Sequence, residues 1–274
     1  VQQQLARLKA AIDQLQNEGV RRFCLVVFSR VVREASNTRQ GEFKLFRLPP
    51  EKLERHNPDV FALFRLRYAE CVSIMGKWWR EVGTNLPSVR LSLHDARKPF
   101  PLEPESVDLM LTSPPYGDAR TTVAYGQFSR LTLQWLGLWD EDLDKIGLGG
   151  QSRALKDVPP SLKEALQAVA NADPKRAEEV AAFYADLQDC LRNIFTTLKT
   201  RGYAIFVVAN RKVKGVRLPT DQAIVEMLPG CKHIATLPRQ IPNKRMPLLN
   251  SPSNVAGQTD TTMLEENIVV LQKA

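Results

Sequence analysis

The sequence contains few of the residues that build metal sites and disulfide frameworks. It has four cysteines and three histidines among 274 residues. Because no two cysteines form a C-x-x-C pair, we expect neither a zinc site nor a disulfide-stabilised secreted fold. Widely spaced cysteines fit free thiols in a reducing compartment. They are Cys24, Cys71, Cys190 and Cys231.

Long apolar runs are also missing. No stretch reaches the roughly 18 consecutive apolar residues that a membrane-spanning helix needs, and no signal peptide is visible. The chain begins with Val1 instead of Met, which fits a fragment or a processed product. The hydrophobic content of 43% suffices for one large domain or two small ones. We therefore expect one or two folded domains and no membrane span.

Acidic residues are outnumbered by basic ones. The formal net charge is +8, from 38 Lys and Arg against 30 Asp and Glu. An excess of this sign favours a polyanionic partner and adds a salt-sensitive affinity for nucleic acid. The alternative reading is that the charge serves solubility alone.

The order of the predicted elements indicates an α/β fold. Helical periodicity marks six segments. From residue 89 onward the elements follow in the order strand, strand, helices, strand, helix, strand, strand. Residues 23–32 are apolar and fit either a helix or a strand. The predicted helices are 1–16, 60–79, 127–138, 161–172, 174–199 and 220–228, and the predicted strands are 89–93, 107–113, 203–209, 233–237 and 267–271.

The most informative motif is the end of the apolar strand at Val107–Ser113. The strand stops in Thr112-Ser113-Pro114-Pro115-Tyr116. Each proline lacks an N–H and fixes φ, and residues before a proline are driven to extended geometry. The result is a stiff turn at the carboxyl end of a strand, where open α/β sheets bind ligands. Taken alone, the same residues also fit an ordinary turn after a strand.

This pentapeptide resembles the catalytic motif of the DNA amino-methyltransferases, most closely the cytosine-N4 branch. The resemblance implies catalytic residues at Ser113, Pro114, Pro115 and Tyr116. The Ser113 hydroxyl and the Pro114 carbonyl would accept hydrogen bonds from an exocyclic amine and localise its lone pair. The Tyr116 ring would stack on a base flipped out of double-stranded DNA. No cysteine follows a proline, so the nucleophile of the cytosine-C5 enzymes is missing.

The resemblance covers residues 89–273 and implies further roles. S-adenosyl-L-methionine is the implied methyl donor, with Asp95 at the acidic position that contacts its adenosine and Thr112 beside it. Arg120 and Tyr125 lie in the segment similar to the target pocket. The implied fold is a partial Rossmann-like methyltransferase sheet with strands equivalent to 3-4-5-7-6 and helical additions. The implied setting is the prokaryotic cytoplasm, as in restriction-modification systems.

One part of the family pattern is missing from the sequence. The F-x-G-x-G turn that cradles the methionine moiety after the first strand does not occur. Glycines 147, 149 and 150 follow an acidic loop and not a strand, so they do not replace it. In the family order 3-2-1-4-5-7-6, strands 1 and 2 would lie beside strand 4, whose edge would otherwise be unpaired. We therefore predict that a second polypeptide, or an upstream segment, supplies strands 1 and 2 and that turn, as in a split, heterodimeric methyltransferase.

Two basic segments are candidates for contact with DNA phosphates. The first follows the strand at residues 203–209, and the second is stiffened by two prolines. Either segment also fits a solvated basic loop. The candidates are Arg211, Lys212, Lys214 and Arg217 in the first segment, and Arg239, Lys244 and Arg245 in the second.

The sequence fits three functions. The first is the catalytic and DNA-recognition portion of a cytosine-N4 methyltransferase. The second is an adenine-N6 enzyme of the same family, and the third is a non-catalytic DNA-recognition subunit of a methylase. For all three we expect an N-terminal, mainly helical region at 1–88 and a catalytic region at 89–274. Residues 140–175 interrupt the α/β rhythm and are the candidate target-recognition insert.

Overall fold

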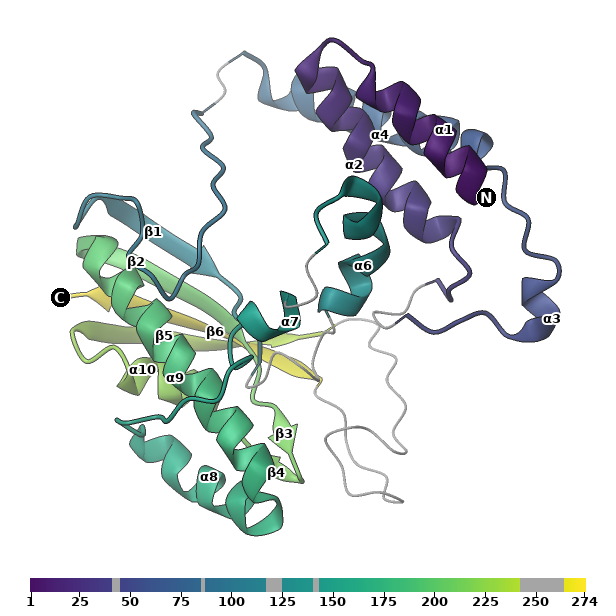
Figure 1. The fold of residues 1–274 in the computed structure, drawn as a ribbon. Helices are drawn as coiled ribbons and strands as arrows, with labels where there is room; N and C mark the ends of the chain where they lie inside the picture. The colour runs from purple at the N-terminus through teal and green to yellow at the C-terminus, as the bar shows by residue number, and fades with distance from the viewer. Residues whose placement is uncertain (41–44, 85–86, 117–124, 140–142, 242–263) are drawn as a thin grey trace. The chain divides into compact units, whose positions relative to one another are not determined.

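The chain forms two compact units. The computed structural model describes residues 1–40, 45–84, 87–116, 125–139, 143–241 and 264–274 (Figure 1). The first unit comprises the described residues of 1–91 and 125–139, and the second comprises those of 92–116, 143–241 and 264–274. None of the helices in these described ranges is long and apolar enough to cross a membrane.

The first unit is a bundle of helices. The apolar residues of 23–32 lie in a helix, capped by the Asn17 side chain, which accepts a hydrogen bond from the Val20 N–H. Its core joins the buried stripes of the first three long helices, with Phe28 and Val31 fully enclosed. The elements are α1 (Gln2–Asp13), α2 (Glu18–Glu34), the short α3 (Pro50–Leu53), α4 (Val60–Val82) and α6 (Tyr125–Leu136).

The second unit is built on a mixed four-stranded sheet. The strands are β1 (Val107–Thr112), β2 (Leu198–Val208), β5 (Cys231–Gln240) and β6 (Glu265–Lys273). Their order is β1-β2-β6-β5. β1 runs parallel to β2, and β6 lies antiparallel between β2 and β5. This order matches the expected 4-5-7-6 portion, so the predicted α/β fold class is confirmed.

Helices cover one face of this sheet. α9 (Pro174–Thr197) packs on β2, α10 (Thr220–Glu226) packs on β5 and β6, and α8 (Pro160–Ala172) packs on α9 (Figure 1). The strand residues Phe206 and Leu271 point into this core and are almost completely buried. The remaining elements of the unit are α7 (Leu143–Ile146) and the two-stranded hairpin of β3 (Lys212–Val213) and β4 (Val216–Arg217).

The opposite face of the sheet carries exposed apolar side chains. Leu109 and Leu111 of β1 are 54% and 64% exposed. Their partners in the register are Tyr203 and Ile205 on β2. Parallel sheets normally bury both faces. The apolar composition of β1 is therefore typical of an interior strand, whereas β1 is the end strand of the described sheet and exposes one face.

The predicted strand at residues 89–93 is wrong. This segment is extended coil without a ladder partner in the described structure, and Val89, Leu91 and Leu93 are exposed. The physical reason is that alternation sets only which side a residue faces, whereas a strand also needs a neighbour for its N–H and C=O groups. In the expected sheet order that neighbour is strand 2, which the described chain does not provide.

Candidate active site

The stiff turn lies where the sequence predicted it, directly after β1. Thr112 is the last residue of the strand and pairs with Phe206 of the parallel β2. Ser113, Pro114, Pro115 and Tyr116 follow it at the carboxyl end of both strands. Because β5 is parallel to β2, through β6, its end at Gln240 lies at the same edge of the sheet. This edge therefore brings together side chains from β1, β5 and β6.

The Tyr116 hydroxyl links the turn after β1 to β6, which lies on the other side of β2 in the sheet. The Tyr116 O–H donates to Oε1 of Glu266 on β6 at 2.8 Å, and the Ser113 Oγ lies 3.3 Å from the same hydroxyl. Glu266 Oε2 lies 3.5 Å from Nε of Arg239, its cross-strand partner on β5. This chain of contacts holds the Ser113–Tyr116 turn to three strands.

The electrostatics of this contact keep Tyr116 protonated. Burial raises the pKa of the Tyr116 hydroxyl, a contribution from the Ser113 contact lowers it, and the Glu266 carboxylate raises it again. A protonated hydroxyl can donate to Glu266, so the bond persists across the neutral range. Tyr116 is half-buried and its ring packs partly against the core cluster.

Asp95 is held by an arginine two residues away. Its carboxylate accepts from Nε and Nη2 of Arg97, both at 2.9 Å, and from the Arg97 backbone N–H at 3.1 Å. The Arg97 hydrogen bond lowers the pKa of Asp95, against a smaller opposing effect of burial. Asp95 is therefore an ionised, oriented carboxylate. Its contacts in the described structure link it to Arg97 and not to Thr112.

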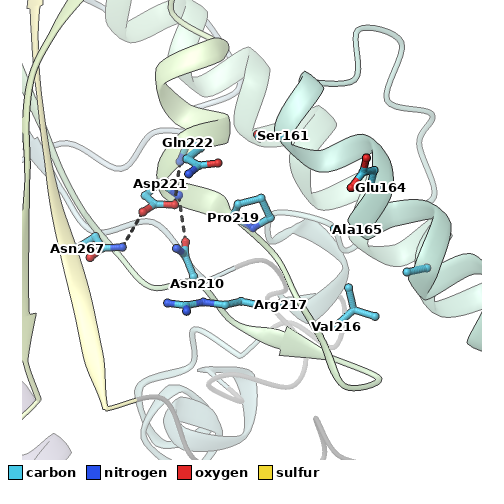
Figure 2. A pocket seen from close by; sticks show the side chains of 11 residues that line it. Ser161, Glu164, Ala165, Asn210, Val216, Arg217, Pro219, Asp221, Gln222 and Asn267 are labelled. Atoms are coloured by element: carbon cyan, nitrogen blue, oxygen red, sulfur yellow. Dashed lines mark hydrogen bonds between the residues drawn. The ribbon is translucent and has the colours of Figure 1, made fainter.

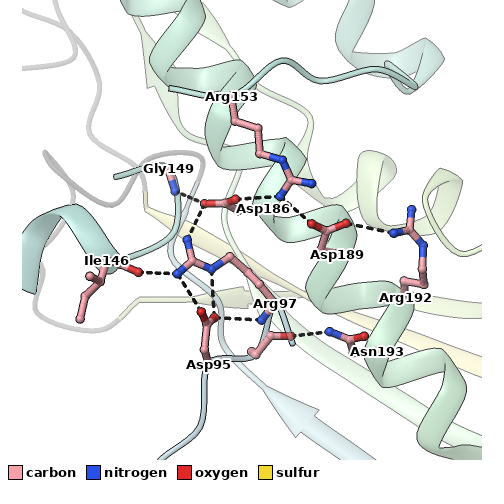
Figure 3. Close-up of polar contacts among 10 residues, drawn as sticks. Asp95, Arg97, Ile146, Gly149, Arg153, Asp186, Asp189, Arg192 and Asn193 are labelled. Atoms are coloured by element: carbon pink, nitrogen blue, oxygen red, sulfur yellow. Dashed lines mark hydrogen bonds and ion pairs between the residues drawn. The ribbon is translucent and has the colours of Figure 1, made fainter. Parts of the chain in front are cut away.

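Arg97 belongs to a wider network that sequence reasoning missed (Figure 3). Its Nη1 lies 3.3 Å from Oδ2 of Asp186, a buried residue of α9. Asp186 also accepts from the Gly149 N–H at 2.8 Å and from Arg153 at 3.2 Å. The signal in the sequence was an aspartate on the otherwise apolar face of a long helix. The network fastens the segment around Asp95 to α9 and to the loop after α7.

Gly149 is needed at its position for two reasons. Its φ is +72°, in the left-handed region, and an added Cβ would lie 3.0 to 3.2 Å from the Cβ, Cα and N atoms of Phe183. The loop can therefore approach α9 closely enough for the Gly149 N–H to reach Asp186. This glycine therefore serves the packing of the loop against α9.

The first predicted basic segment forms the β3–β4 hairpin and its flanks. Lys214 and Gly215 have φ of 50° and 79°, as a two-residue type I′ turn requires. Arg211 is buried, Lys212 lies on β3, and Lys214 pairs with Asp173 at 2.9 Å. The exposed Arg217 lies on β4. The four residues are thus distributed between the interior and the surface.

Arg217 lines a polar cleft of about 610 Å³ that sequence reasoning also missed (Figure 2). The Asn267 amide donates to Oδ2 of Asp221 at 2.7 Å, and the Asp221 N–H donates to Oδ1 of Asn210 at 3.2 Å. Asn210 follows β2 and Asn267 is near the start of β6, so the cleft opens at the same edge of the sheet as Ser113. Polar residues directly at the ends of apolar strands were the available signal.

Several predicted site residues are not placed by the described structure. Arg120, Lys244 and Arg245 lie outside the described residues, and so does part of the candidate insert at 140–175. Tyr125 is the first residue of α6, in the first unit, and its side chain is not described. Within the described ranges, no group of His, Cys, Asp and Glu side chains is arranged to hold a metal ion.

Comparison with known proteins identifies one clear relative. No protein-family model matches the chain. The chain is 38% identical over 288 aligned residues to the type II methyltransferase M.MvaI of Kocuria varians. The alignment covers 98% of this chain but 63% of the relative, so the chain spans less than two thirds of that protein's length.

Among solved structures, the chain is weakly similar to a proposed DNA modification methylase of Thermus thermophilus, solved in complex with S-adenosyl-L-methionine. The match has 17% identity and a TM-score of 0.32, and it covers 66% of this chain and 54% of the other. A likeness this weak carries no weight for fold or function, and the α/β assignment stands on the sheet itself.

Proposed function

We propose that this chain is the catalytic and DNA-recognition portion of a DNA methyltransferase that modifies the exocyclic N4 of cytosine. The observation that carries the proposal is the Ser113-Pro114-Pro115-Tyr116 turn at the carboxyl end of β1, tied through Tyr116 to Glu266. The 38% identity to a type II methyltransferase along almost the entire chain supports it.

The turn supplies what an exocyclic amine needs to become a nucleophile. In our proposal the Ser113 Oγ and the Pro114 carbonyl accept the two N–H bonds of the amine, which localises its lone pair. Tyr116 offers a ring for stacking the flipped base, while its hydroxyl stays fixed on Glu266. Catalysis is then positioning and electrostatics, without a covalent enzyme intermediate.

The methyl donor in this proposal is S-adenosyl-L-methionine, which supplies an electrophilic methyl group. The residues fit this cofactor in part. Asp95 is an ionised carboxylate with a fixed orientation, suited to accept from hydroxyl or amine donors of an adenosine, and Thr112 ends the strand that precedes the turn. The glycine turn for the methionine moiety is missing from the sequence.

We propose further that another polypeptide segment, separate or upstream, completes the sheet. Among the described residues, β1 has a parallel partner on one side only, and its exposed leucines fit an interior position. Residues 89–93 carry strand alternation but have no ladder partner in the part of the chain that the structure describes. More than a third of the methyltransferase relative lies outside the matched region, enough to hold such a segment. Tight binding of S-adenosyl-L-methionine by this chain alone, measured by calorimetry, would refute this part of the proposal.

Placement at the same edge of the sheet supports some DNA-contact candidates more than others. Arg239 is exposed and lies near the end of β5, at the edge that carries the turn. Arg217 is exposed on β4 of the separate hairpin and lines the cleft that opens at this edge. If both contact DNA phosphates, changing either one to Gln should lower affinity for all sequences and reduce the salt dependence. Buried Arg211 is a weaker candidate for direct contact.

The experiment that tests the function is analysis of methylated nucleosides. The chain and its completing polypeptide are incubated with DNA and the methyl donor, and the nucleosides are separated by mass spectrometry. We expect N4-methylcytosine in the wild type, its loss in Ser113→Ala, and no change in the control Ser73→Ala on an exposed helix face. N6-methyladenine as the only product would establish the adenine enzyme instead. Unchanged methylation in Ser113→Ala would support a non-catalytic recognition subunit.

A further inference from the structure

The second half of α4 presents an apolar face that the described chain does not cover. From residue 71 onward, the apolar side chains fall on one arc of about 160° at 100° per residue. The arc holds Cys71, Val72, Ile74, Met75, Trp78, Trp79 and Val82, and the other side holds Ser73, Gly76, Lys77, Arg80 and Glu81. Ile74 is 62% exposed and Trp79 is 53% exposed.

The first half of the same helix has its partners. Val60 is fully buried, and Phe64 packs against the core of the first unit. Arg67 pairs with Glu34 of α2 at 2.8 Å, and the Tyr68 ring meets Phe23 edge to face at 5.5 Å. These contacts come from the first three turns of α4. The apolar arc continues along the same side of the helix, beyond the point where α1 and α2 support it.

A strand-like segment follows this helix. α4 ends at Gly83, whose φ of +67° terminates it, and residues 87–93 follow as an extended trace without regular secondary structure (Figure 1). In that segment Val89, Leu91 and Leu93 alternate with Arg90 and Ser92. A helix leading into a strand is one half of a parallel crossover, and a crossover helix packs its apolar side across the sheet that its strand joins.

We propose that the apolar arc of α4, with residues 87–93, is the docking surface for the segment that completes the sheet. The inference rests on the proposed function and names the occupant as the polypeptide with the F-x-G-x-G turn and at least two parallel strands. One strand pairs with residues 87–93, and the new sheet surface covers Ile74, Met75 and Trp78. The residues of the type II methyltransferase relative beyond the match are numerous enough to provide such strands.

A second copy of this chain is a poorer occupant. Two apolar arcs could cover each other, and residues 87–93 of two copies could pair as an antiparallel ladder. A second copy would still leave β1 as the end strand of the described sheet, whereas the completing segment covers the helix face, pairs with residues 87–93 and extends the sheet beyond β1. The two occupants differ in whether the chain dimerises by itself, which can be measured.

The test measures association alone. The chain is mixed with the F-x-G-x-G polypeptide from the adjoining coding sequence, without DNA or methyl donor, and binding is followed by sedimentation and calorimetry. We expect Ile74→Glu to weaken association at least thirtyfold. The control Ser73→Glu adds the same charge one position away, on the polar side, and should change association less than threefold. Both side chains are exposed, so circular dichroism should show a folded chain in each variant.

Hydrogen exchange identifies the occupant. In the complex, the amides of residues 87–93 should exchange at least a hundredfold more slowly than in the chain alone, because they enter a ladder. Equal effects of the two variants, or no protection in 87–93, would overturn the proposal. So would a dimer of this chain alone that Ile74→Glu dissociates. Association and hydrogen exchange do not depend on methylation. A complex that forms as expected but gives no methylated nucleoside in the separate assay would count against the proposed function only.

Discussion

The bond between Tyr116 and Glu266 allows the sharpest prediction. Replacing Tyr116 with Phe removes a 2.8 Å hydrogen bond to a carboxylate and keeps the ring. A bond to a charged group contributes about 1.5–3 kcal/mol. Tyr116 is half-buried and water can replace part of the interaction, while Glu266, with 13% of its side chain exposed, keeps its 3.5 Å contact with Arg239. We therefore expect a loss of about 1–2 kcal/mol in the free energy of unfolding.

The assay compares thermal or urea unfolding of Tyr116→Phe with that of Tyr203→Phe. Tyr203 lies on β2 in the same unit and is 41% exposed, and removal of its hydroxyl should change the unfolding free energy by less than about 0.5 kcal/mol. A loss of 1–2 kcal/mol corresponds to about 2–8 °C in Tm for a unit of this size. Equal stability of the two variants would refute the assigned role of the hydroxyl.

The pH dependence gives an independent check. The pKa of Tyr116 is raised in the folded chain, so its contribution is present below the unfolded value of about 10 and is lost as the pH rises through the folded value. Tyr184 also has a raised pKa because of burial, but it is common to both proteins. Wild type should therefore lose more stability between about pH 9 and pH 11 than Tyr116→Phe. Parallel curves would contradict the shift.

Three further predictions test the supports of the site. Gly149→Ala should destabilise the second unit by about 2–4 kcal/mol, because the strain of a left-handed backbone adds to a clash of the new Cβ with Phe183. The control Gly215→Ala has a similar φ but open space around the new Cβ, so it should cost about 1 kcal/mol. Equal urea midpoints for the two variants would contradict the clash. Arg97 lowers the pKa of Asp95 in the folded chain, so the pair contributes stability that is present above the pKa of Asp95 in the unfolded chain and is lost as the pH falls. Arg97→Gln should therefore reduce the dependence of the unfolding free energy on pH below about pH 4. An unchanged acid unfolding curve, followed by circular dichroism, would argue against the pair. Burial raises the pKa of Cys190 to about 12. Mass spectrometry should therefore find this thiol unmodified by iodoacetamide at about pH 8 until the chain unfolds. Rapid labelling of the folded chain would show that the site around Cys190 opens.

The local sequence predicted the elements of the second unit well where one chain segment is sufficient. The apolar runs at 107–113 and 203–209 became the strands β1 and β2, although β2 begins earlier, at Leu198. Helical periodicity marked α8 and α9. The order of β1, β2, β6 and β5 followed from the family resemblance and is confirmed. Two consecutive prolines fixed the turn after β1 through their own covalent geometry. These features depend on residues close together in the chain.

Contacts across long stretches of chain could not be predicted in this way. Tyr116 and Glu266 are 150 positions apart, and nothing near either residue selects the other. Arg97 and Asp186 meet only because the segment before β1 lies along α9. The same limit explains the wrong strand at residues 89–93. The alternation of apolar and polar residues can be read from the sequence. A strand also needs a hydrogen-bonded neighbour, and only the tertiary structure decides whether a second strand lies beside it.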